Sequence, residues 1–235
     1  MIYIMSDLHG CYQTFLEALH QIHFSDDDTL YILGDVIDRG SESIPLLQDM
    51  SMRWNVIPLL GNHEYMALQV LERFCVEIKE DNYDSHLTSD DLKAYLHWME
   101  NGGDTTLNAF LQLDKEERFA IIDYLNEFTL YETLRYQNQN YLLVHAGLCP
   151  YDPQKSFDDY QPYELLFQSQ EVYDLPYTMI CGHTPTFAYG KEYENKIFQK
   201  DNYINIDCGL VYGRKLAVYC LDSNQVIYID KKEAL

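Results

Sequence analysis

Short apolar runs alternate with amphipathic stretches in the first quarter of the chain. The runs at 2–5, 30–33 and 55–60 are short and rich in aliphatic residues, which favours buried strands. Residues 11–23 and 42–52 carry apolar side chains at helical spacing between them. The order strand, helix, strand, helix, strand predicts a layered α/β fold with polar residues along one edge.

The middle of the chain has a different pattern. Apolar positions at helical spacing dominate residues 65–130, and we expect helices over 65–80, 89–100, 104–112 and 115–127. This stretch is interpreted as a helical insertion that covers one side of a cleft.

Strand-like runs return after the helical stretch. They lie at 141–144, 177–180, about 203–207, 215–221 and 225–230. A short helix is expected near 163–168, and two of the last strands are expected to form a hairpin through 222–224. We predict one α/β domain over residues 1–235, which includes the helical insertion.

Five of the expected strands end in groups that bind metals or phosphate. These groups are Asp7 and His9, then Asp35, Asp38 and Arg39, then Asn62 and His63, then His145, and last His183. Open α/β sheets place their sites beyond the carboxyl ends of strands, so we expect one shared site. Asp7 and His9 are two residues apart and would point to the same side of an extended backbone.

The types of these side chains indicate the metal class. Carboxylate, imidazole and amide oxygen together suit Mn²⁺, Fe or Zn²⁺ better than Ca²⁺, and the pattern contains no thiolate pair of the structural zinc kind. Two divalent ions that share a carboxylate clamp an in-line displacement at phosphorus. The expected cofactors are therefore two divalent ions, with Mn²⁺ preferred.

Composition and charge limit the kinds of partner that the protein can bind. The 235 residues carry a formal net charge of −22, which disfavours binding of nucleic acid through a broad basic surface. Six cysteines form no Cys-x-x-Cys pair, and no apolar stretch is long enough to span a membrane. We expect a reduced, cytoplasmic protein without a signal peptide. The oligomeric state stays open.

Five motifs together resemble the calcineurin-like metallophosphoesterases. They are Ser-Asp-Leu-His-Gly, Gly-Asp-Val-Ile-Asp-Arg-Gly, Gly-Asn-His-Glu, His-Ala-Gly and Gly-His-Thr, in this order. The chain is most similar to the bacterial phosphoprotein phosphatases, which act on phosphoserine and phosphothreonine. This resemblance implies a four-layer α-β-β-α sandwich.

The resemblance also implies a role for each matching residue. The metal ligands would be Asp7, His9 and Asp35 for the first ion and Asn62, His145 and His183 for the second, with Asp35 bridging. A hydroxide between the ions would be the nucleophile. His63 would be the general acid, and Asp38 would orient it. Arg39 and Asn62 would contact the phosphoryl group.

One phosphate-binding arginine of the family is absent. The family carries it in a helix after the His-Ala-Gly motif. The matching segment of this chain is residues 165–169, whose last residue is Ser169. No arginine lies between His145 and His183. Arg214 is an alternative phosphate donor, since it follows a glycine near a strand.

Three functions are consistent with these residues. The leading hypothesis is a metal-dependent phosphomonoesterase that acts on phosphoserine and phosphothreonine in proteins, or on phosphotyrosine or a small phosphomonoester. The first alternative is a symmetrical diadenosine tetraphosphate hydrolase, although those relatives typically have Asp at the position of Glu64 and lack Asp-Arg-Gly. The second is a phosphoprotein-binding pseudophosphatase, suggested by the absent arginine.

Overall fold

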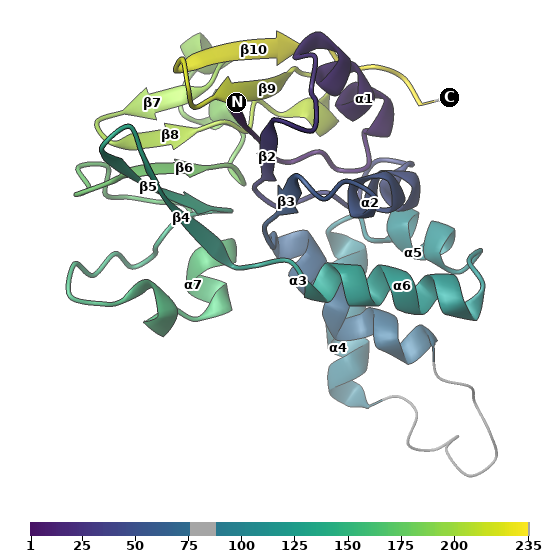
Figure 1. The fold of residues 1–235 in the computed structure, drawn as a ribbon. Coiled ribbons are helices and arrows are strands. Elements are labelled where there is room, and N and C mark those ends of the chain that lie inside the picture. Colours follow the sequence, from purple (N-terminus) through teal and green to yellow (C-terminus); the bar gives the residue numbers. More distant parts are fainter. Residues whose placement is uncertain (76–87, 235) are drawn as a thin grey trace, which may run out of the picture.

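The computed structural model describes residues 1–75 and 88–234 (Figure 1). These residues form two five-stranded sheets. The first sheet contains, in spatial order, β10 (Gln225–Ile229), β9 (Leu216–Cys220), β1 (Ile2–Met5), β2 (Thr29–Ile32) and β3 (Val56–Pro58). The second contains β4 (Tyr131–Tyr136), β5 (Gln139–Val144), β6 (Thr178–Cys181), β8 (Tyr203–Asn205) and β7 (Phe198–Lys200).

Each sheet has a parallel centre. β1 pairs with β2, and β2 with β3, in parallel, as do β5 with β6 and β6 with β8. The outer pairs are antiparallel, and β9 and β10 form the predicted hairpin. Parallel neighbours end on the same edge of a sheet, so the loops that follow them are brought together.

The alternation of side chains along the strands separates two cores. In β1, Tyr3 and Met5 face the helices, whereas Ile4 joins residues of the other sheet in a second buried cluster. In β5, Leu142 belongs to the first cluster and Leu143 to the second. The two sheets therefore pack face to face, with helices outside them, which confirms the predicted sandwich.

Seven α-helices lie within the described residues. They are α1 (Tyr12–Gln21), α2 (Ser43–Ser51), α3 (Asn62–Leu71), α4 (Ser89–Glu100), α5 (Asp104–Phe110), α6 (Lys115–Asn126) and α7 (Pro162–Leu166). α1 contacts both α2 and β10 of the first sheet, and α7 lies beside the second sheet (Figure 1). α2 contacts α5 and α6, and α3 contacts α4 and α6, so the helical stretch forms one packed group.

The helix expected over 65–80 begins earlier than its apolar pattern indicated. α3 starts at Asn62, and a single 3₁₀ turn over Glu72–Phe74 follows it. Residues 76–80 of that expectation lie outside the described residues. No helix of the described ranges combines the length and apolar character needed to cross a bilayer.

Two strands are absent from the sequence-based prediction. β4 is an edge strand whose side chains are all half-buried or exposed, so its sequence lacks a buried apolar run. β7 has only three residues and also lies at an edge of its sheet. Both strands are specified by their neighbours more than by their own hydrophobic pattern.

Candidate metal centre

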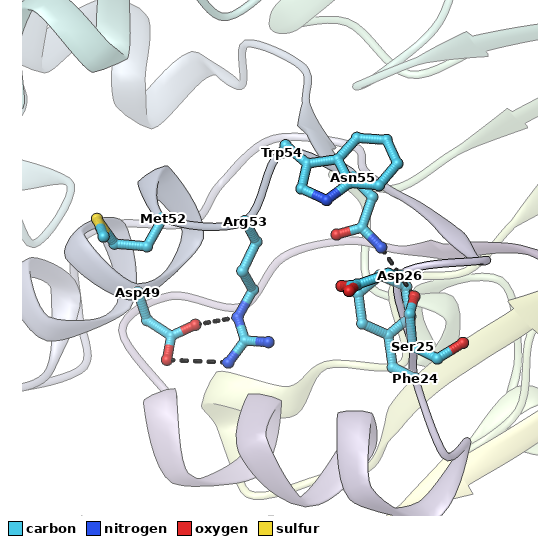
Figure 2. Close-up of a pocket in the computed structure, with 8 residues that line it drawn as sticks. All are labelled: Phe24, Ser25, Asp26, Asp49, Met52, Arg53, Trp54 and Asn55. Atoms are coloured by element: carbon cyan, nitrogen blue, oxygen red, sulfur yellow. Dashed lines mark hydrogen bonds and ion pairs between the residues drawn. The ribbon is translucent and has the colours of Figure 1, made fainter.

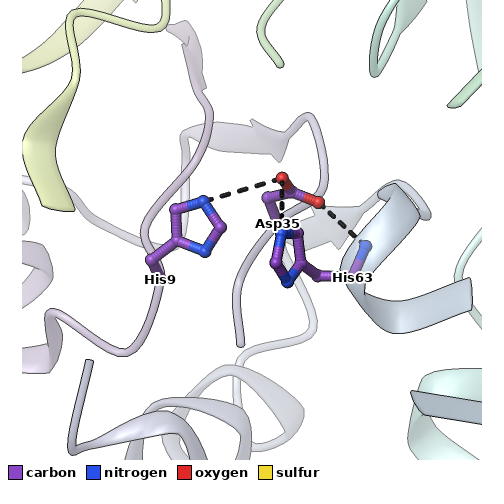
Figure 3. Close-up of side chains that lie close together, drawn as sticks. All are labelled: His9, Asp35 and His63. Carbon is purple, nitrogen blue, oxygen red and sulfur yellow. Dashed lines mark hydrogen bonds and ion pairs between the residues drawn. The ribbon is translucent and has the colours of Figure 1, made fainter. Parts of the chain in front are cut away.

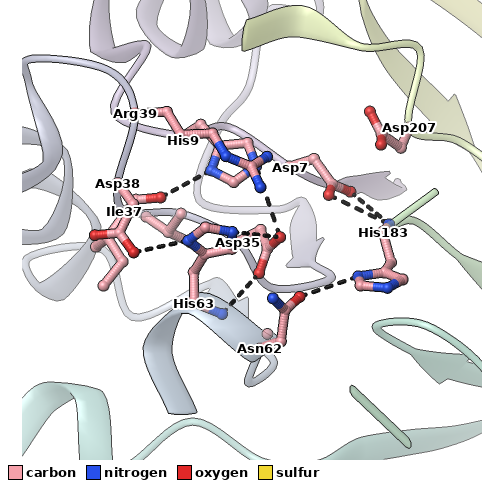
Figure 4. Close-up of polar contacts among 12 residues, drawn as sticks. Asp7, His9, Asp35, Ile37, Asp38, Arg39, Asn62, His63, His183 and Asp207 are labelled. Carbon is pink, nitrogen blue, oxygen red and sulfur yellow. Dashed lines mark hydrogen bonds and ion pairs between the residues drawn. The ribbon is translucent and has the colours of Figure 1, made fainter. Parts of the chain in front are cut away.

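All five sequence motifs lie beyond the carboxyl ends of strands. β1, β2 and β3 lead into three of them from the first sheet, and β5 and β6 lead into the other two from the second. Figure 4 shows side chains from both sheets around a common centre. The two sheets thus contribute to one site, although each holds only part of it.

The loops reach this geometry through unusual backbone conformations. Six predicted site residues have left-handed backbone: Asp7, His9, Asp35, Asp38, Arg39 and His183. Asp7 and His9 have φ values of 53° and 42°, so the extended backbone assumed for them is wrong. The turn, rather than strand alternation, sets where they point. Such conformations cost of order 1–3 kcal/mol each and cluster at functional sites.

His9, Asp35 and His63 form a first group of potential ligands (Figure 3). The Oδ2 atom of Asp35 lies 3.6 Å from His9 Nε2 and 3.9 Å from His63 Nε2. The two imidazole rings meet edge to face, with their centroids 4.8 Å apart. All three side chains are buried.

A second group lies on the other side of Asp35 and contains His145 and His183. Asp35 Oδ1 lies 3.4 Å from His145 Nε2. The amide oxygen of Asn62 lies 2.9 Å from His145 Nε2 and 3.0 Å from His183 Nδ1. Asp35 therefore offers one carboxylate oxygen to each group, as a bridging ligand does.

Backbone carbonyls determine which imidazole nitrogens are free to bind a cation. His9 Nδ1 lies 2.9 Å from the Ile37 carbonyl, and His145 Nδ1 lies 2.7 Å from the Leu33 carbonyl. A carbonyl only accepts, so both Nδ1 atoms carry the proton and both Nε2 lone pairs point into the site. The His9 lone pair accepts a hydrogen bond from Arg39 Nη1 at 2.8 Å, which a bound cation would have to displace. Lone pairs and carboxylate oxygens that converge in this way fit a pair of divalent cations.

Burial keeps the histidine ligands in the neutral form that a cation prefers. It lowers the pKa of His183 to about 4 and lowers the pKa values of His9 and His145 well below their usual value. Burial also raises the pKa values of Asp7 and Asp35, so protons compete with a cation for these carboxylates more than they would at an exposed site.

Asp7 belongs to neither ligand group within the described residues. Its carboxylate instead accepts hydrogen bonds from the backbone N–H of His183, at 3.1 and 3.2 Å. A Cβ on Gly182 would approach Asp7 Oδ2 to 2.1 Å, so glycine is required there. Asp7 joins the loops of the two sheets, and its ligand role stays a prediction.

His63 is bound by a carboxylate on one side and faces the site on the other. Its Nδ1 lies 2.7 Å from Asp38 Oδ2, and both side chains are fully buried. Among the described residues, His63 Nε2 has no hydrogen-bond partner. Burial raises the pKa of Asp38 to about 7 and lowers the pKa of His63 well below its usual value.

The sequence analysis missed the residue that anchors this pair. The indole Nε1–H of Trp98, on α4, donates to Asp38 Oδ2 at 2.7 Å, and the indole is fully buried. Thr106 Oγ1 accepts from the Asp38 backbone N–H at 2.9 Å. The helical stretch therefore holds the orienting carboxylate. No local signal identifies Trp98, since 60 residues separate it from Asp38.

Glu64 is a second residue whose role the motif alone did not reveal. Its carboxylate accepts four backbone N–H groups at 2.7–3.1 Å, from Gly61 and from Asp35, Val36 and Ile37. It therefore fixes the loop of the bridging carboxylate to the start of α3. Its place directly after His63, in the first turn of α3, is the only sequence signal.

Arg39 lies at the exposed edge of the centre. Its Nη1 is 2.8 Å from His9 Nε2, and its backbone N–H donates to the carbonyl of Gly102 at 3.0 Å. The side chain is thus beside the first ligand group, where a phosphoryl oxygen would need a donor.

Arg214 has partners of its own. Its Nη1 donates to Glu194, and its guanidinium lies over the ring of Phe187, 5.1 Å from the centroid. Near the position of the absent arginine, Ser169 forms a hydroxyl hydrogen bond with Thr184, next to His183. A role for Arg214 in phosphate binding stays a prediction.

A separate surface hollow of about 390 Å³ is lined by eight residues (Figure 2): Phe24, Ser25, Asp26, Asp49, Met52, Arg53, Trp54 and Asn55. Arg53 Nη2 donates to Asp49 Oδ2 at 3.2 Å within it, and Trp54 is 78% exposed. None of its lining residues belongs to the two ligand groups.

A two-sheet sandwich with carboxylate, imidazole and amide ligands at the shared strand ends defines a metal-dependent phosphoesterase. The sequence profile of the calcineurin-like phosphoesterases matches residues 1–213. The chain belongs to this family, as its motifs indicated.

Named relatives fall into two groups. The symmetrical bis(5'-nucleosyl)-tetraphosphatase of Wigglesworthia glossinidia brevipalpis is 30% identical over 122 residues, 51% of this chain and 43% of that protein. Serine/threonine-protein phosphatase 2 of Salmonella typhimurium is 44% identical over 72 residues, 30% of this chain and 33% of that protein. The matched segments span less than half the length of these relatives.

The fold has a close structural counterpart. A crystal structure provisionally described as a diadenosine tetraphosphatase superposes with a TM-score of 0.65 and 18% identity, over 99% of this chain and 94% of that one. At this identity the likeness establishes the fold alone.

Proposed function

We propose that this phosphoesterase hydrolyses dinucleoside tetraphosphates symmetrically, at the central phosphoanhydride bond, to give two nucleoside diphosphates. The assignment is supported by the curated relatives with the longer matched segments, which are named as symmetrical tetraphosphatases. This proposal replaces hydrolysis of phosphoproteins as the leading hypothesis, because the protein phosphatase relative matches a shorter segment of the chain.

The observation that supports hydrolysis at phosphorus is the position of the Asp35 carboxylate. Its Oδ2 atom faces the first ligand group and its Oδ1 atom faces the second. His9 would hold one divalent ion, and Asn62, His145 and His183 would hold the other. Bound there, the ions would supply Lewis acidity and an activated water. Mn²⁺ is the preferred ion, with Fe or Zn²⁺ as alternatives.

The protein's own groups act on the substrate around this pair of ions. Arg39 donates hydrogen bonds to the phosphoryl oxygens from the exposed edge. His63, oriented by Asp38, donates a proton from Nε2 to the leaving oxygen. An anionic phosphoryl group beside His63 raises the pKa of the imidazole and favours its protonated form.

A second candidate is hydrolysis of phosphomonoesters on protein side chains. The His63–Asp38–Trp98 arrangement favours it, because an alkoxide leaving group depends on a proton donor more than a nucleoside diphosphate does. The same residues would act, and only the leaving group differs.

The test compares kcat/KM for diadenosine tetraphosphate with that for phosphoserine, phosphothreonine and phosphotyrosine peptides. The protein is stripped of metal and then given Mn²⁺, and His63→Ala serves as the inactive control. A higher value for the dinucleotide, with ADP as the only product, supports the proposal. A higher value for any phosphopeptide replaces it with the second candidate. Binding of metal without turnover of either substrate would contradict both catalytic proposals and leave the phosphoprotein-binding alternative.

A further inference from the structure

A row of four side chains lies at the rim of the metal centre, with two aromatic rings between two arginines. The Arg39 guanidinium is 5.8 Å from the ring centroid of Tyr212, and Tyr212 meets Phe187 edge to face at 6.0 Å. Arg214 covers Phe187 at 5.1 Å. We call these four residues the aromatic rim.

The aromatic rim is joined to the centre at one end. Arg39 contacts His9 Nε2 of the first ligand group at 2.8 Å. A ligand lying along the rim would therefore reach the ions with one end, while its other end stays on the aromatic rings.

Backbone contacts fix the other residues of the rim. Thr186, next to Phe187, donates its backbone N–H to the carbonyl of Asp207 at 2.8 Å, and Asp207 Oδ1 accepts from Gly209 N. Gly209 has φ +82°, and a Cβ there would lie 2.8 Å from Phe187 Cε1, so Phe187 packs on bare backbone. The rim is a built surface rather than a chance gathering of side chains.

Exposure and charge indicate what the rim binds. Tyr212 is 56% exposed and Phe187 is 36% exposed, so two rings face solvent beside a polar site. The chain has a net charge of −22, yet two of its six arginines lie in this row. Glu194 forms an ion pair with Arg214, whereas Arg39 contacts His9 of the first ligand group. Flat rings beside a guanidinium suit a planar π system that carries an anionic group.

We infer that the aromatic rim binds the nucleobase of a nucleotide whose phosphates extend past Arg39 to the metal centre. The inference rests on the proposed function and adds to it the part of the substrate that this chain recognises away from phosphorus. Tyr212 stacks on the base, and Phe187 borders it. Because every base has a π face, stacking supplies affinity with little choice between adenine and guanine.

The test measures binding instead of turnover. α,β-Methylene-ADP is the adenosyl ester of methylenediphosphonate, so both present a P–C–P group to the Mn²⁺-loaded protein and only the first carries a ribose and a base. Calorimetry on the wild type should show about tenfold or more tighter binding of the nucleotide, as expected for stacking on an aromatic side chain. Tyr212→Ala should remove most of this preference, and Tyr212→Trp should retain it.

Trp54→Ala is the matched control, since Trp54 is an exposed aromatic residue of the hollow in Figure 2 and lies outside the rim. Equal affinity of the wild type for both ligands would overturn the inference. So would a Tyr212→Ala variant that keeps the preference, or one that loses it only as much as Trp54→Ala does.

The inference and the proposed function can fail separately. If the base preference depends on Tyr212 but diadenosine tetraphosphate is not hydrolysed, the proposed function fails and the nucleobase site stands. If the dinucleotide is hydrolysed without any base preference in binding, the nucleobase site fails alone.

Discussion

Trp98→Phe removes one hydrogen-bond donor from the buried His63–Asp38 pair, to which we assign protonation of the leaving group. The indole Nε1–H lies 2.7 Å from Asp38 Oδ2, the same oxygen that His63 Nδ1 contacts at 2.7 Å. The other oxygen, Oδ1, has no hydrogen-bond partner among the described residues. Phenylalanine keeps an aromatic ring at the site but leaves Asp38 held mainly by His63.

The expected magnitude follows from that single contact. A hydrogen bond to a charged group contributes about 1.5–3 kcal/mol, and the smaller ring adds a cavity cost. We expect the free energy of unfolding to fall by about 2–4 kcal/mol. If about 1.4 kcal/mol of the loss appears in the transition state, kcat falls about tenfold.

The assay separates positioning from simple destabilisation through the leaving group. Glycerol phosphate releases an alkoxide that needs a proton, whereas p-nitrophenyl phosphate releases a stable phenolate. Trp98→Phe should lower kcat about tenfold on the first substrate and less than about threefold on the second. Trp54→Phe is the control, because Trp54 is the only other tryptophan and is 78% exposed.

Equal losses on the two substrates would refute the positioning role, because a partly unfolded enzyme loses activity regardless of the leaving group. Unchanged kinetics on glycerol phosphate would also refute it. The wild-type ratio between the substrates should reappear in the Trp54→Phe control.

Three other outcomes are expected. Burial raises the pKa values of Asp7 and Asp35, so protons should compete with Mn²⁺ more strongly as the pH falls. The metal-induced rise in Tm should therefore be larger at pH 8 than at pH 5.5, and a pH-independent rise would contradict this. Glu64→Gln places an amide NH₂ against backbone donors and should cost about 2–4 kcal/mol in urea unfolding. A Cβ in Gly61→Ala would lie 2.3 Å from Asp35 N and Oδ1, so Mn²⁺ affinity measured by titration should fall. Gly213→Ala strains a left-handed backbone at φ +79° but meets no atom within 4 Å, so it should keep the wild-type affinity.

Much of the fold followed from local patterns. The three N-terminal strands and their helices were predicted because short aliphatic runs and amphipathic stretches alternate there. The edge strands β4 and β7 were missed because half-exposed strands lack a buried apolar run. The extended conformation predicted for Asp7 and His9 was wrong, because the surrounding loops hold both residues in left-handed turns.

The sequence by itself determined the inventory of the site: carboxylate, imidazole and amide groups directly after strands. These are local properties, because a strand and the loop that ends it are neighbours in the chain. Only the tertiary structure decided that the two carboxylate oxygens of Asp35 face different ligand groups. It also decided that Trp98 donates a hydrogen bond to Asp38 and that Arg214 lies over the ring of Phe187. Those contacts join segments far apart in sequence, and no local periodicity encodes which distant side chain will complete a hydrogen bond.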